Sequence, residues 1–395
     1  MKRVLTGAGA LLLLATAACG GTSSGTTSTS YKGNTIKLGA VFSLTGLGGV
    51  YGPQSKNAAL LAQDDINAKG GVNGATIQLT VVDDGSDKTQ AAQQTQTLIQ
   101  EDGVIALLGP TLSNSAVAAH PVADSLKTPM MGTSNTGLNI VGTCPYPCDY
   151  IFRDSLGEQD AIPANIKTYA DAKHPKTGVV LYPNDDKFSS DGAQIVNDTA
   201  PKYGIKIVKT IQFTKNEADL SPYVTEAVAA NPDVIFITSL GGIPAKIMTT
   251  ARADGWQGQF LGGNGFNTAA VSKQAGQAGL GAQSGSAWYP GINTQSNRDF
   301  IAHYKAKYGA DPDQLAAQAY TGVMILADAA SRANLTFKDV AKDRTSMRDA
   351  MLATNLSDTP LGPFKFTSSH DVKQTIYVVA MDGKGGFTLV STVPL

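Results

Sequence analysis

Short apolar runs alternate with amphipathic segments along most of the chain. Residues 104–108 read VIALL, an uninterrupted apolar run typical of a strand that is covered on both faces. Residues 53–69 instead repeat apolar side chains such as Leu61 and Ile66 at helical spacing, and a Gly-Gly pair at 70–71 ends the pattern. Strands that alternate with helices in this way predict βαβ units, parallel sheets and right-handed crossovers.

This alternation occurs twice in succession, so we expect an α/β fold with two Rossmann-like lobes and parallel-rich sheets. In the first half, strands are expected at 36–42, 76–83, 104–108 and 129–132, with helices at 53–69, 88–102 and 113–126. In the second half, strands are expected at 178–182, 205–211, 234–238 and 259–261, with helices at 161–172, 191–203, 219–230, 243–254 and 269–276. The tail predicts helices at 298–308, 314–333 and 345–353, then a β meander at 364–367, 374–381 and 387–390.

The N-terminal residues have the pattern of an export signal. Lys2 and Arg3 precede an apolar run at 8–18 that is too short to span a bilayer. The small residues before Cys19 resemble a bacterial lipobox, in which Cys19 is lipidated and becomes the first mature residue. Thr16 departs from the Leu that is usual at its position. An ordinary signal peptide with an incidental cysteine is the alternative.

A tether follows the signal. Residues 20–30 are almost all Gly, Ser and Thr, a composition that buries little apolar surface and behaves as a flexible linker. We therefore assign residues 1–18 to a signal peptide and 19–33 to the lipidated Cys19 and its tether. The expected location is extracytoplasmic, with a lipid anchor in the cell membrane, at the cell surface or in the periplasm. After residue 19 no apolar run is long enough to cross a bilayer.

Cys144 and Cys148 are the other cysteines, in the sequence CPYPC. In an exported protein two neighbouring cysteines predict a disulfide that closes a small loop. A redox motif is less favoured because three residues separate the cysteines. A zinc site is less favoured because no histidine lies nearby.

Composition and motifs mainly exclude classes of function. The formal net charge is −1 with no basic block, which argues against nucleic acid as a partner. Motifs of serine hydrolases, zinc proteases and phosphate-binding loops are absent from the sequence. Asp83 and Asp84 offer paired carboxylates for acid–base chemistry, but a solvated or capping pair is the favoured interpretation. We therefore expect no enzymatic activity, no cofactor and no metal site.

Polar side chains follow several predicted strands, where open α/β sheets bind their ligands. The strand at 104–108 is followed by Thr111 and Ser113, just where a helix begins. A helix N-terminus has free N–H groups and a positive dipole end, which suit a carboxylate. Alternatively, Ser113 only caps the helix. Equivalent polar loops lie at 43–52, 133–136, 184–188, 239–242 and 262–266.

Six segments taken together carry a family resemblance. They are IKLGAVFSLTG at 36–46, DINAKGGVNG at 65–74, VVDDGSD at 81–87, VIALLGPTLSNSAVAA at 104–119, YIFRDS at 150–155 and FLGGNGFN at 260–267. In this order they resemble the solute-binding proteins of branched-chain amino-acid ABC transporters, the leucine/isoleucine/valine-binding type with a type I periplasmic-binding fold. The resemblance covers nearly everything after the tether.

The resemblance implies two lobes that close on a ligand about a hinge that the chain crosses three times. The crossings are expected near 153–157, 287–290 and 361–364. Lobe one would be 34–155 plus 288–361, and lobe two 156–287 plus 362–395. The implied partners are a small-molecule ligand and an ABC permease and ATPase complex, with the chain itself a monomer.

The resemblance also implies roles for single residues. Ser113 falls on the serine that holds the ligand carboxylate, and the neighbouring Thr111 belongs to the same loop. Asn135 and Thr136 fall on a segment that binds the ligand's charged end. The remaining expected contacts are Tyr51, which covers that end, Phe188, an aromatic from lobe two, and Ser239 or its neighbour Thr238.

Asn264 departs from the family pattern, which has an acidic residue here to pair with the ligand's ammonium group. Asn is neutral, and an ammonium buried without a counter-charge is costly. Asp154 and Asp185 are candidates to supply the missing charge. Otherwise, ligands without a cationic group compete: branched or aromatic acids, oxo acids or amides. We therefore expect a solute receptor for a small carboxylate-bearing ligand; a sensing module, an amide or urea binder and an exported enzyme are the alternatives.

Overall fold

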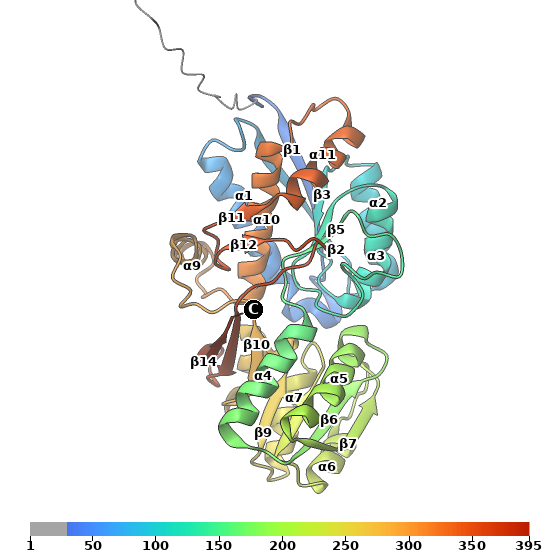
Figure 1. Cartoon of the computed structure of the whole chain (residues 1–395), viewed down its shortest axis with the longest axis vertical. Coiled ribbons are helices and arrows are strands. Elements are labelled where there is room, and N and C mark those ends of the chain that lie inside the picture. The colour runs from blue at the N-terminus through green and yellow to red at the C-terminus, as the bar shows by residue number, and fades with distance from the viewer. Residues whose placement is uncertain (1–29, 395) are drawn as a thin grey trace, which may run out of the picture.

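The computed structural model describes residues 30–394, in which the strands form a five-stranded sheet, a seven-stranded sheet and a two-stranded ribbon. The two larger sheets belong to two lobes that are stacked end to end (Figure 1). The prediction of an α/β fold with two lobes and parallel-rich sheets is confirmed.

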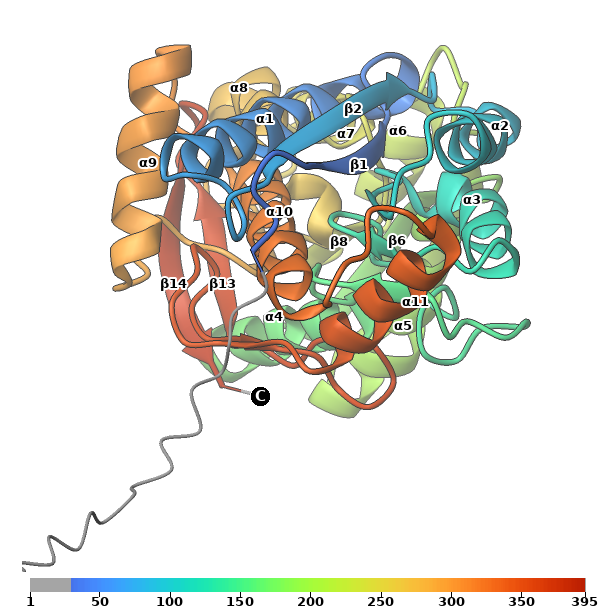
Figure 2. The same ribbon diagram turned by 90° about the horizontal axis from the view of Figure 1, so that it is seen from above.

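The first sheet is wholly parallel, with strand order β2-β1-β3-β4-β5. Its strands are β1 (Thr35–Phe42), β2 (Thr76–Asp83), β3 (Ala106–Leu108), β4 (Met130–Gly132) and β5 (Ile151–Arg153). Alternate residues of β1 face opposite sides: Leu38 packs in a core with α1 (Gly52–Ala68) and α10 (Gln314–Arg332). Val41 packs in a second core with α2 (Lys88–Gln100) and α3 (Ser113–Ser125). Figure 2 shows α2 and α3 together on one side of β1, with α1 and α10 on the other.

The second sheet has the order β14-β13-β10-β9-β8-β6-β7. Its strands are β6 (Thr177–Pro183), β7 (Lys206–Phe213), β8 (Val234–Ile237), β9 (Gln259–Gly262), β10 (Gln283–Ser286), β13 (Ile376–Met381) and β14 (Phe387–Val393). One face is covered by α4 (Glu158–Lys173) and α5 (Lys187–Thr199), the other by α6 (Ser221–Ala229), α7 (Ile243–Ala253) and α8 (Ala269–Ala275). Short 3-10 turns are η1 (Gly46–Val50), η2 (Ala200–Tyr203), η3 (Asn264–Phe266) and η4 (Gly276–Gly279).

The tail is where the prediction was partly wrong. The helices are α9 (Gln295–Tyr308), α10 and α11 (Val340–Leu352), as expected within a few residues. The three-stranded meander does not form, because β12 (Phe364–Lys365) pairs with β11 (Asn355–Leu356) instead. Only β13 and β14 pair as a hairpin, and β13 joins the second sheet antiparallel to β10.

The third passage between the lobes lies later than the expected 361–364. Phe364, Phe366 and Val372 are buried in the core of the first sheet, with residues of β1 and α10. The chain reaches the second sheet only at Ile376. The apolar side chains between 364 and 372 therefore keep this segment on lobe one.

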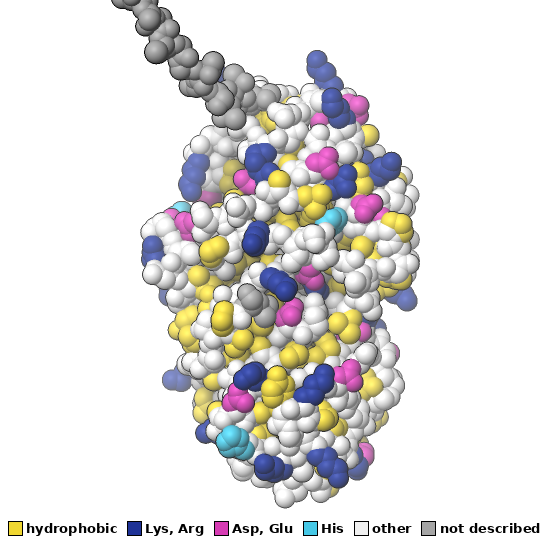
Figure 3. Space-filling view, in the orientation of Figure 1, with side chains coloured by type: hydrophobic (Ala, Val, Ile, Leu, Met, Phe, Trp, Pro, Cys, Tyr) yellow, Lys and Arg dark blue, Asp and Glu magenta, His cyan; other side chains and the backbone are white. Residues whose placement is uncertain are grey.

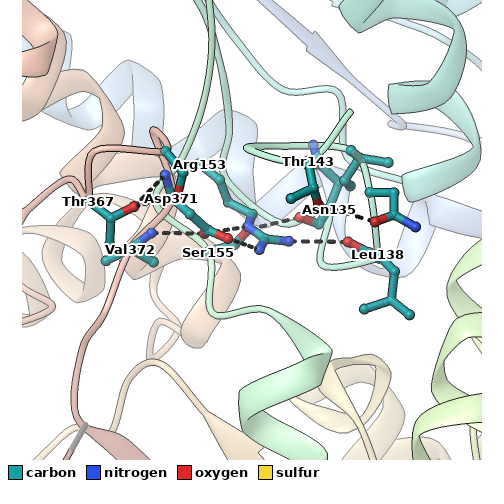
Figure 4. Close-up of polar contacts among 12 residues, drawn as sticks. Asn135, Leu138, Thr143, Arg153, Ser155, Thr367, Asp371 and Val372 are labelled. Atoms are coloured by element: carbon teal, nitrogen blue, oxygen red, sulfur yellow. Dashed lines mark hydrogen bonds and ion pairs between the residues drawn. The ribbon is translucent and has the colours of Figure 1, made fainter. Parts of the chain in front are cut away.

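An ion pair joins the first and third passages (Figure 4). The Nε of the buried Arg153 donates to Asp371 Oδ1 at 2.9 Å, and its Nη2 bonds Oδ2 of the same carboxylate. Its Nη1 donates to the Gly137 carbonyl at 3.3 Å. One residue earlier, Phe152 stacks on His370 with ring centroids 4.5 Å apart. A guanidinium matches a carboxylate with two bonds, so this pair fixes the two passages side by side.

Cys144 and Cys148 form the predicted disulfide. Among residues 30–394, no helix combines the length and the apolar character needed to span a bilayer. The predicted signal peptide, Cys19 and residues 20–29 lie outside the described part of the chain. On the face shown in Figure 3, positive and negative side chains are interspersed over both lobes, as the net charge of −1 suggests.

Candidate functional site

A small cavity of ≈ 20 Å³ lies between the two lobes. Its walls come from the C-terminal ends of strands in both sheets and from the first turn of α10. The lining residues are Tyr51, Thr111, Leu112, Ser113, Ser134, Phe188, Leu240, Asn264, Gly265 and Leu315. Five of the eight predicted ligand-binding residues therefore line one cavity, namely Tyr51, Thr111, Ser113, Phe188 and Asn264.

One wall of the cavity is apolar. The buried side chains of Leu112, Phe188, Leu240 and Leu315 pack with Tyr51 in a single cluster. Phe188 comes from α5 and Leu315 from α10, so both lobes contribute to this wall. A ligand placed here would bury an apolar body against aliphatic and aromatic carbon.

Tyr51 reaches across from lobe one to lobe two. Its hydroxyl donates to the Gly265 carbonyl and accepts from the Gly241 N–H, each at 3.0 Å. Burial raises the pKa of this phenol, so it stays protonated and can make both bonds. The loop before α1 is glycine-rich for a steric reason, since a Cβ on Gly52 would lie 2.1 Å from the Ser43 carbonyl oxygen. The tyrosine thus covers the cavity from a tightly folded loop.

Ser113 contributes a polar group to the cavity lining. It is the first residue of α3, and the N-cap is Leu112, which makes no side-chain bond to the helix. By contrast, Asp87 caps α2 and Asp186 caps α5 through their carboxylates. The interpretation of Ser113 as a helix cap is therefore wrong: its Oγ instead accepts the Gly137 N–H at 3.1 Å. An uncapped helix start beside a cavity retains its affinity for an anion.

Thr111 and Ser134 complete the polar end. Thr111 Oγ1 accepts the Ser43 N–H at 2.9 Å, and Ser134 Oγ donates to the Thr111 carbonyl at the same distance. These bonds join the ends of β1, β3 and β4, so the hydroxyls are held rigidly. Ser134 belongs to the polar loop at 133–136 that the sequence indicated, but Asn135 and Thr136 were the residues predicted from that loop to contact the ligand.

Three predicted residues do not line the cavity. Asn135 turns away and donates to the Pro110 carbonyl at 2.7 Å. Thr136 Oγ1 donates to Glu158 Oε1 at 3.0 Å. Ser239 is buried behind the cavity wall, with its carbonyl oxygen 2.4 Å from where a Cβ on Gly265 would lie. Their direct contact with a ligand stays a prediction.

Glu158 is a buried acid that the sequence did not single out. Its Oε1 accepts both the Thr136 hydroxyl and the Asn264 N–H, the latter at 2.8 Å, so it joins the two lobes beneath the cavity. Burial raises the pKa of this carboxyl to about 7. As a glutamate in the first turn of α4 it looks ordinary in the sequence, because acids are common at helix starts.

The acids proposed to replace the missing charge at Asn264 do not reach the cavity. Asp154 is fully buried, and burial raises the pKa of its carboxyl well above the usual range. Asp185 is exposed and its Oδ1 accepts the Lys215 N–H at 2.7 Å. All side chains that line the cavity are uncharged. Within residues 30–394, no cluster of His, Cys, Asp and Glu is suited to hold a metal ion.

Comparison with known proteins agrees with this geometry. A family model described as "Periplasmic binding protein" matches residues 35–386. A leucine-, isoleucine-, valine-, threonine- and alanine-binding protein of Pseudomonas aeruginosa is 25% identical over 90% of this chain and 92% of its own. It is a binding protein rather than an enzyme.

Two solved structures share the fold. A branched-chain amino-acid transporter substrate-binding protein, LivJ, of Streptococcus pneumoniae, in complex with isoleucine, has a TM-score of 0.81 at 24% identity, covering 92% of this chain and 99% of that one. A solute-binding protein of an ABC transporter from R. palustris, in complex with benzoate, also has a TM-score of 0.81, at 22% identity over 92% and 98% of the two chains. The two-lobed architecture is therefore that of known solute receptors.

Proposed function

The chain belongs to the periplasmic binding protein family, and from that premise we propose that it is the extracytoplasmic solute-binding component of an ABC importer. It binds a small carboxylate-bearing ligand between its lobes and delivers it to a permease and ATPase complex. The observation that carries this proposal is the cavity itself. An uncapped helix start with Ser113 and an apolar cluster from both lobes line it together.

The ligand is a small acid with an apolar body. Its carboxylate would accept bonds from Ser113 and the first N–H groups of α3, where the helix dipole favours an anion. The isoleucine and benzoate named for the two solved structures share this chemistry of a carboxylate on an apolar body.

Closure of the lobes encloses the ligand. Besides Tyr51, contacts between lobes include Asn114 Nδ2 donating to Asp186 Oδ2 at 2.8 Å and Thr268 Oγ1 donating to the Val50 carbonyl at 3.2 Å. These bonds surround the cavity and would break when the lobes move apart about the hinge. The closed form therefore excludes water from the ligand and strengthens its polar contacts.

An amide or urea-type solute is the second candidate. The uncharged lining favours it, because a neutral solute needs no counter-charge in the cavity. The two candidates differ in their need for an anion at Ser113, and that difference can be measured.

A thermal-shift screen of the exported protein, followed by calorimetry, tests the proposal. The panel holds branched-chain and aromatic acids, their amino and oxo forms, and each matched primary amide. A ligand that binds only the folded state raises the melting temperature. We expect carboxylates to raise it and their amides not to. A shift with amides alone would replace the proposal by the second candidate, and no shift with any carboxylate would refute it.

Attachment to the membrane rests on Cys19 and stays a proposal. Replacing Cys19→Ser should move the protein from the membrane fraction to the soluble extracytoplasmic fraction, with ligand binding unchanged. Equal membrane association of the variant would contradict a lipid anchor at this cysteine. A monomer is expected, and sedimentation of the released variant would measure it.

A further inference from the structure

Hydrogen bonds that converge on Asn264 fix which way its amide faces. Asn264 Oδ1 accepts from Gln314 Nε2 and, at 3.4 Å, from Asn267 Nδ2. Its own Nδ2 donates to the Ser134 carbonyl at 3.4 Å. The oxygen of Asn264 is thus turned toward α10, and the nitrogen toward the polar end of the cavity.

Backbone groups at the ends of this network fix the donor and acceptor roles. Gln314 Oε1 accepts the Ala287 N–H at 3.0 Å, and a backbone N–H can only donate. Gln314 Oε1 also accepts the Ser286 hydroxyl at 2.5 Å. The opposite atom of the same amide, Nε2, must then be the donor toward Asn264. At the far end Ser134 contributes a carbonyl, which can only accept.

Asn267 reinforces the same direction. Its Nδ2 donates to the Gly285 carbonyl at 2.8 Å, and its Oδ1 accepts the Ser284 hydroxyl. All the groups named here are buried in the described chain. A flip of either amide would place two donors or two acceptors face to face, which is costly away from water.

We propose that Gln314 sets the specificity of the cavity by holding Asn264 with its amide nitrogen toward the cavity, where one N–H is left for the ligand, so that the site takes 2-oxo or 2-hydroxy carboxylic acids in preference to amino acids. An ammonium group has donors only and would meet the remaining N–H donor of Asn264. An oxo or hydroxyl oxygen accepts a bond there. This inference rests on the proposed function, because it assumes a carboxylate at Ser113.

The second polar group of the ligand belongs next to its carboxylate. Ser134 connects the two ends of the polar wall, since its Oγ bonds the Thr111 carbonyl and its own carbonyl bonds Asn264. The polar groups thus form one continuous strip, and the apolar cluster lines the same cavity. A ligand that fits the strip carries both polar groups at one end, as a 2-oxo acid does.

Gln314 is contributed by lobe one, whereas Asn264 and Asn267 belong to lobe two. The network is therefore complete only when the lobes are closed. Selection between an oxo and an amino group takes place at closure, when an unmatched pair of donors would have to be buried.

Calorimetric titration with matched pairs tests this inference. The probes are 4-methyl-2-oxopentanoate against leucine, and phenylpyruvate against phenylalanine. We expect the wild type to bind an oxo acid at least about tenfold more tightly than its amino counterpart, since a buried unpaired polar group costs about 1–3 kcal/mol. This comparison requires no variant.

The variant Gln314→Glu keeps the shape and the acceptor for Ala287 but removes the donor toward Asn264. The Asn264 amide should then turn its oxygen to the cavity, and the new carboxylate adds negative charge behind it. We expect the preference to move toward the amino acid by about tenfold or more. Gln63→Glu is the matched control, because Gln63 Oε1 also accepts a backbone N–H, from Leu79 at 2.8 Å, and does not line the cavity.

The outcomes distinguish a failure of this inference from a failure of the proposed function. Tighter binding of leucine than of its oxo analogue by the wild type overturns the role of Gln314 while the proposed function stands. If benzoate binds but neither member of a matched pair does, the role of Gln314 is also overturned. The same holds if a folded Gln314→Glu variant keeps the wild-type preference. If no carboxylate binds at all, the proposed function fails first.

Discussion

Ser113 and the start of α3 form the polar end of the cavity, and the hydroxyl is expected to meet the ligand carboxylate. Replacing Ser113→Ala should weaken binding by about 1–3 kcal/mol, the cost of losing a bond to a charged group. Isothermal titration calorimetry measures it. Ser115→Ala, on the same helix but outside the cavity lining, is the control and should bind as the wild type does. Equal affinity in both variants, with normal folding, would remove Ser113 from the site.

We expect position 264 to decide which polar group the ligand carries next to its carboxylate. Asn264→Asp adds a carboxylate that can still accept from Gln314 and leaves one oxygen for the ligand. The ranking of ligands should shift toward amino acids over their deaminated analogues, because the ammonium gains a buried counter-charge. Competition binding with leucine and 4-methyl-2-oxopentanoate measures the ratio. A ratio equal to that of the wild type would mean that residue 264 does not face this part of the ligand.

Glu158 should make stability depend on pH. Its pKa rises on folding from 4.5 to about 7 through burial, so the folded chain keeps a proton that the unfolded chain releases. This contribution is fully present below the unfolded pKa and is lost as pH rises through about 7. Relative to Glu158→Gln, the wild type should lose up to about 3 kcal/mol of unfolding free energy across that window. Urea titrations at several pH values measure it, with Glu101→Gln as an exposed control; a pH-independent difference would contradict the shift.

A site residue could be predicted from the sequence when it lies close to the end of a recognisable strand. Ser113 and Asn264 follow strands directly, and resemblance to a known family assigned them. The loop at 133–136 was indicated, but Asn135 and Thr136 were chosen from it instead of Ser134, because a single residue step decides which side chain faces the cavity. Leu315 and Gln314 begin a helix far along the chain, and only tertiary packing brings them to the cleft. No local pattern marks such residues.

Elements with strong periodicity were predicted within a few residues, whereas the weak ones were not. α10 was expected at 314–333 and is found at Gln314–Arg332. β10 was missed because its sequence QSGS contains no β-branched or aromatic residue, and it is a strand only through pairing with β9 and β13. The meander was wrong for a related reason: the segment 364–367, which reads FKFT, was assigned to its neighbours in sequence instead of to β11.

The disulfide loop offers a prediction at the scale of one element. Cys144 and Cys148 are four residues apart, so the bond closes a small ring and restricts the unfolded chain only modestly. The double variant Cys144→Ala/Cys148→Ala should lose about 2 kcal/mol of unfolding free energy. Chemical denaturation measures this, and calorimetry should show unchanged ligand affinity because neither cysteine lines the cavity. A large loss of affinity would place this loop in the site.

At the scale of the whole molecule, Tyr51 connects the lobes from within the cavity. Tyr51→Phe keeps the ring but removes both bonds of the hydroxyl, to Gly265 and Gly241. Ligand affinity should fall by about 1–3 kcal/mol, because the Gly241 N–H is left unpaired when the lobes close. Small-angle X-ray scattering at saturating ligand should still report the compact form. Unchanged affinity would mean that these bonds do not contribute to closure.

Enclosure of the ligand between the lobes also affects how long the ligand stays bound. A ligand held between Tyr51, Phe188 and the start of α3 cannot leave while the lobes stay together. Escape must wait for the hinge to open, so the residence time of a bound molecule is set by lobe opening, a motion of microseconds to milliseconds or slower. Ligands of different chemistry would then share a common slow step on departure. If the chain delivers its ligand to a permease as proposed, a contact that separates the lobes would shorten this residence time.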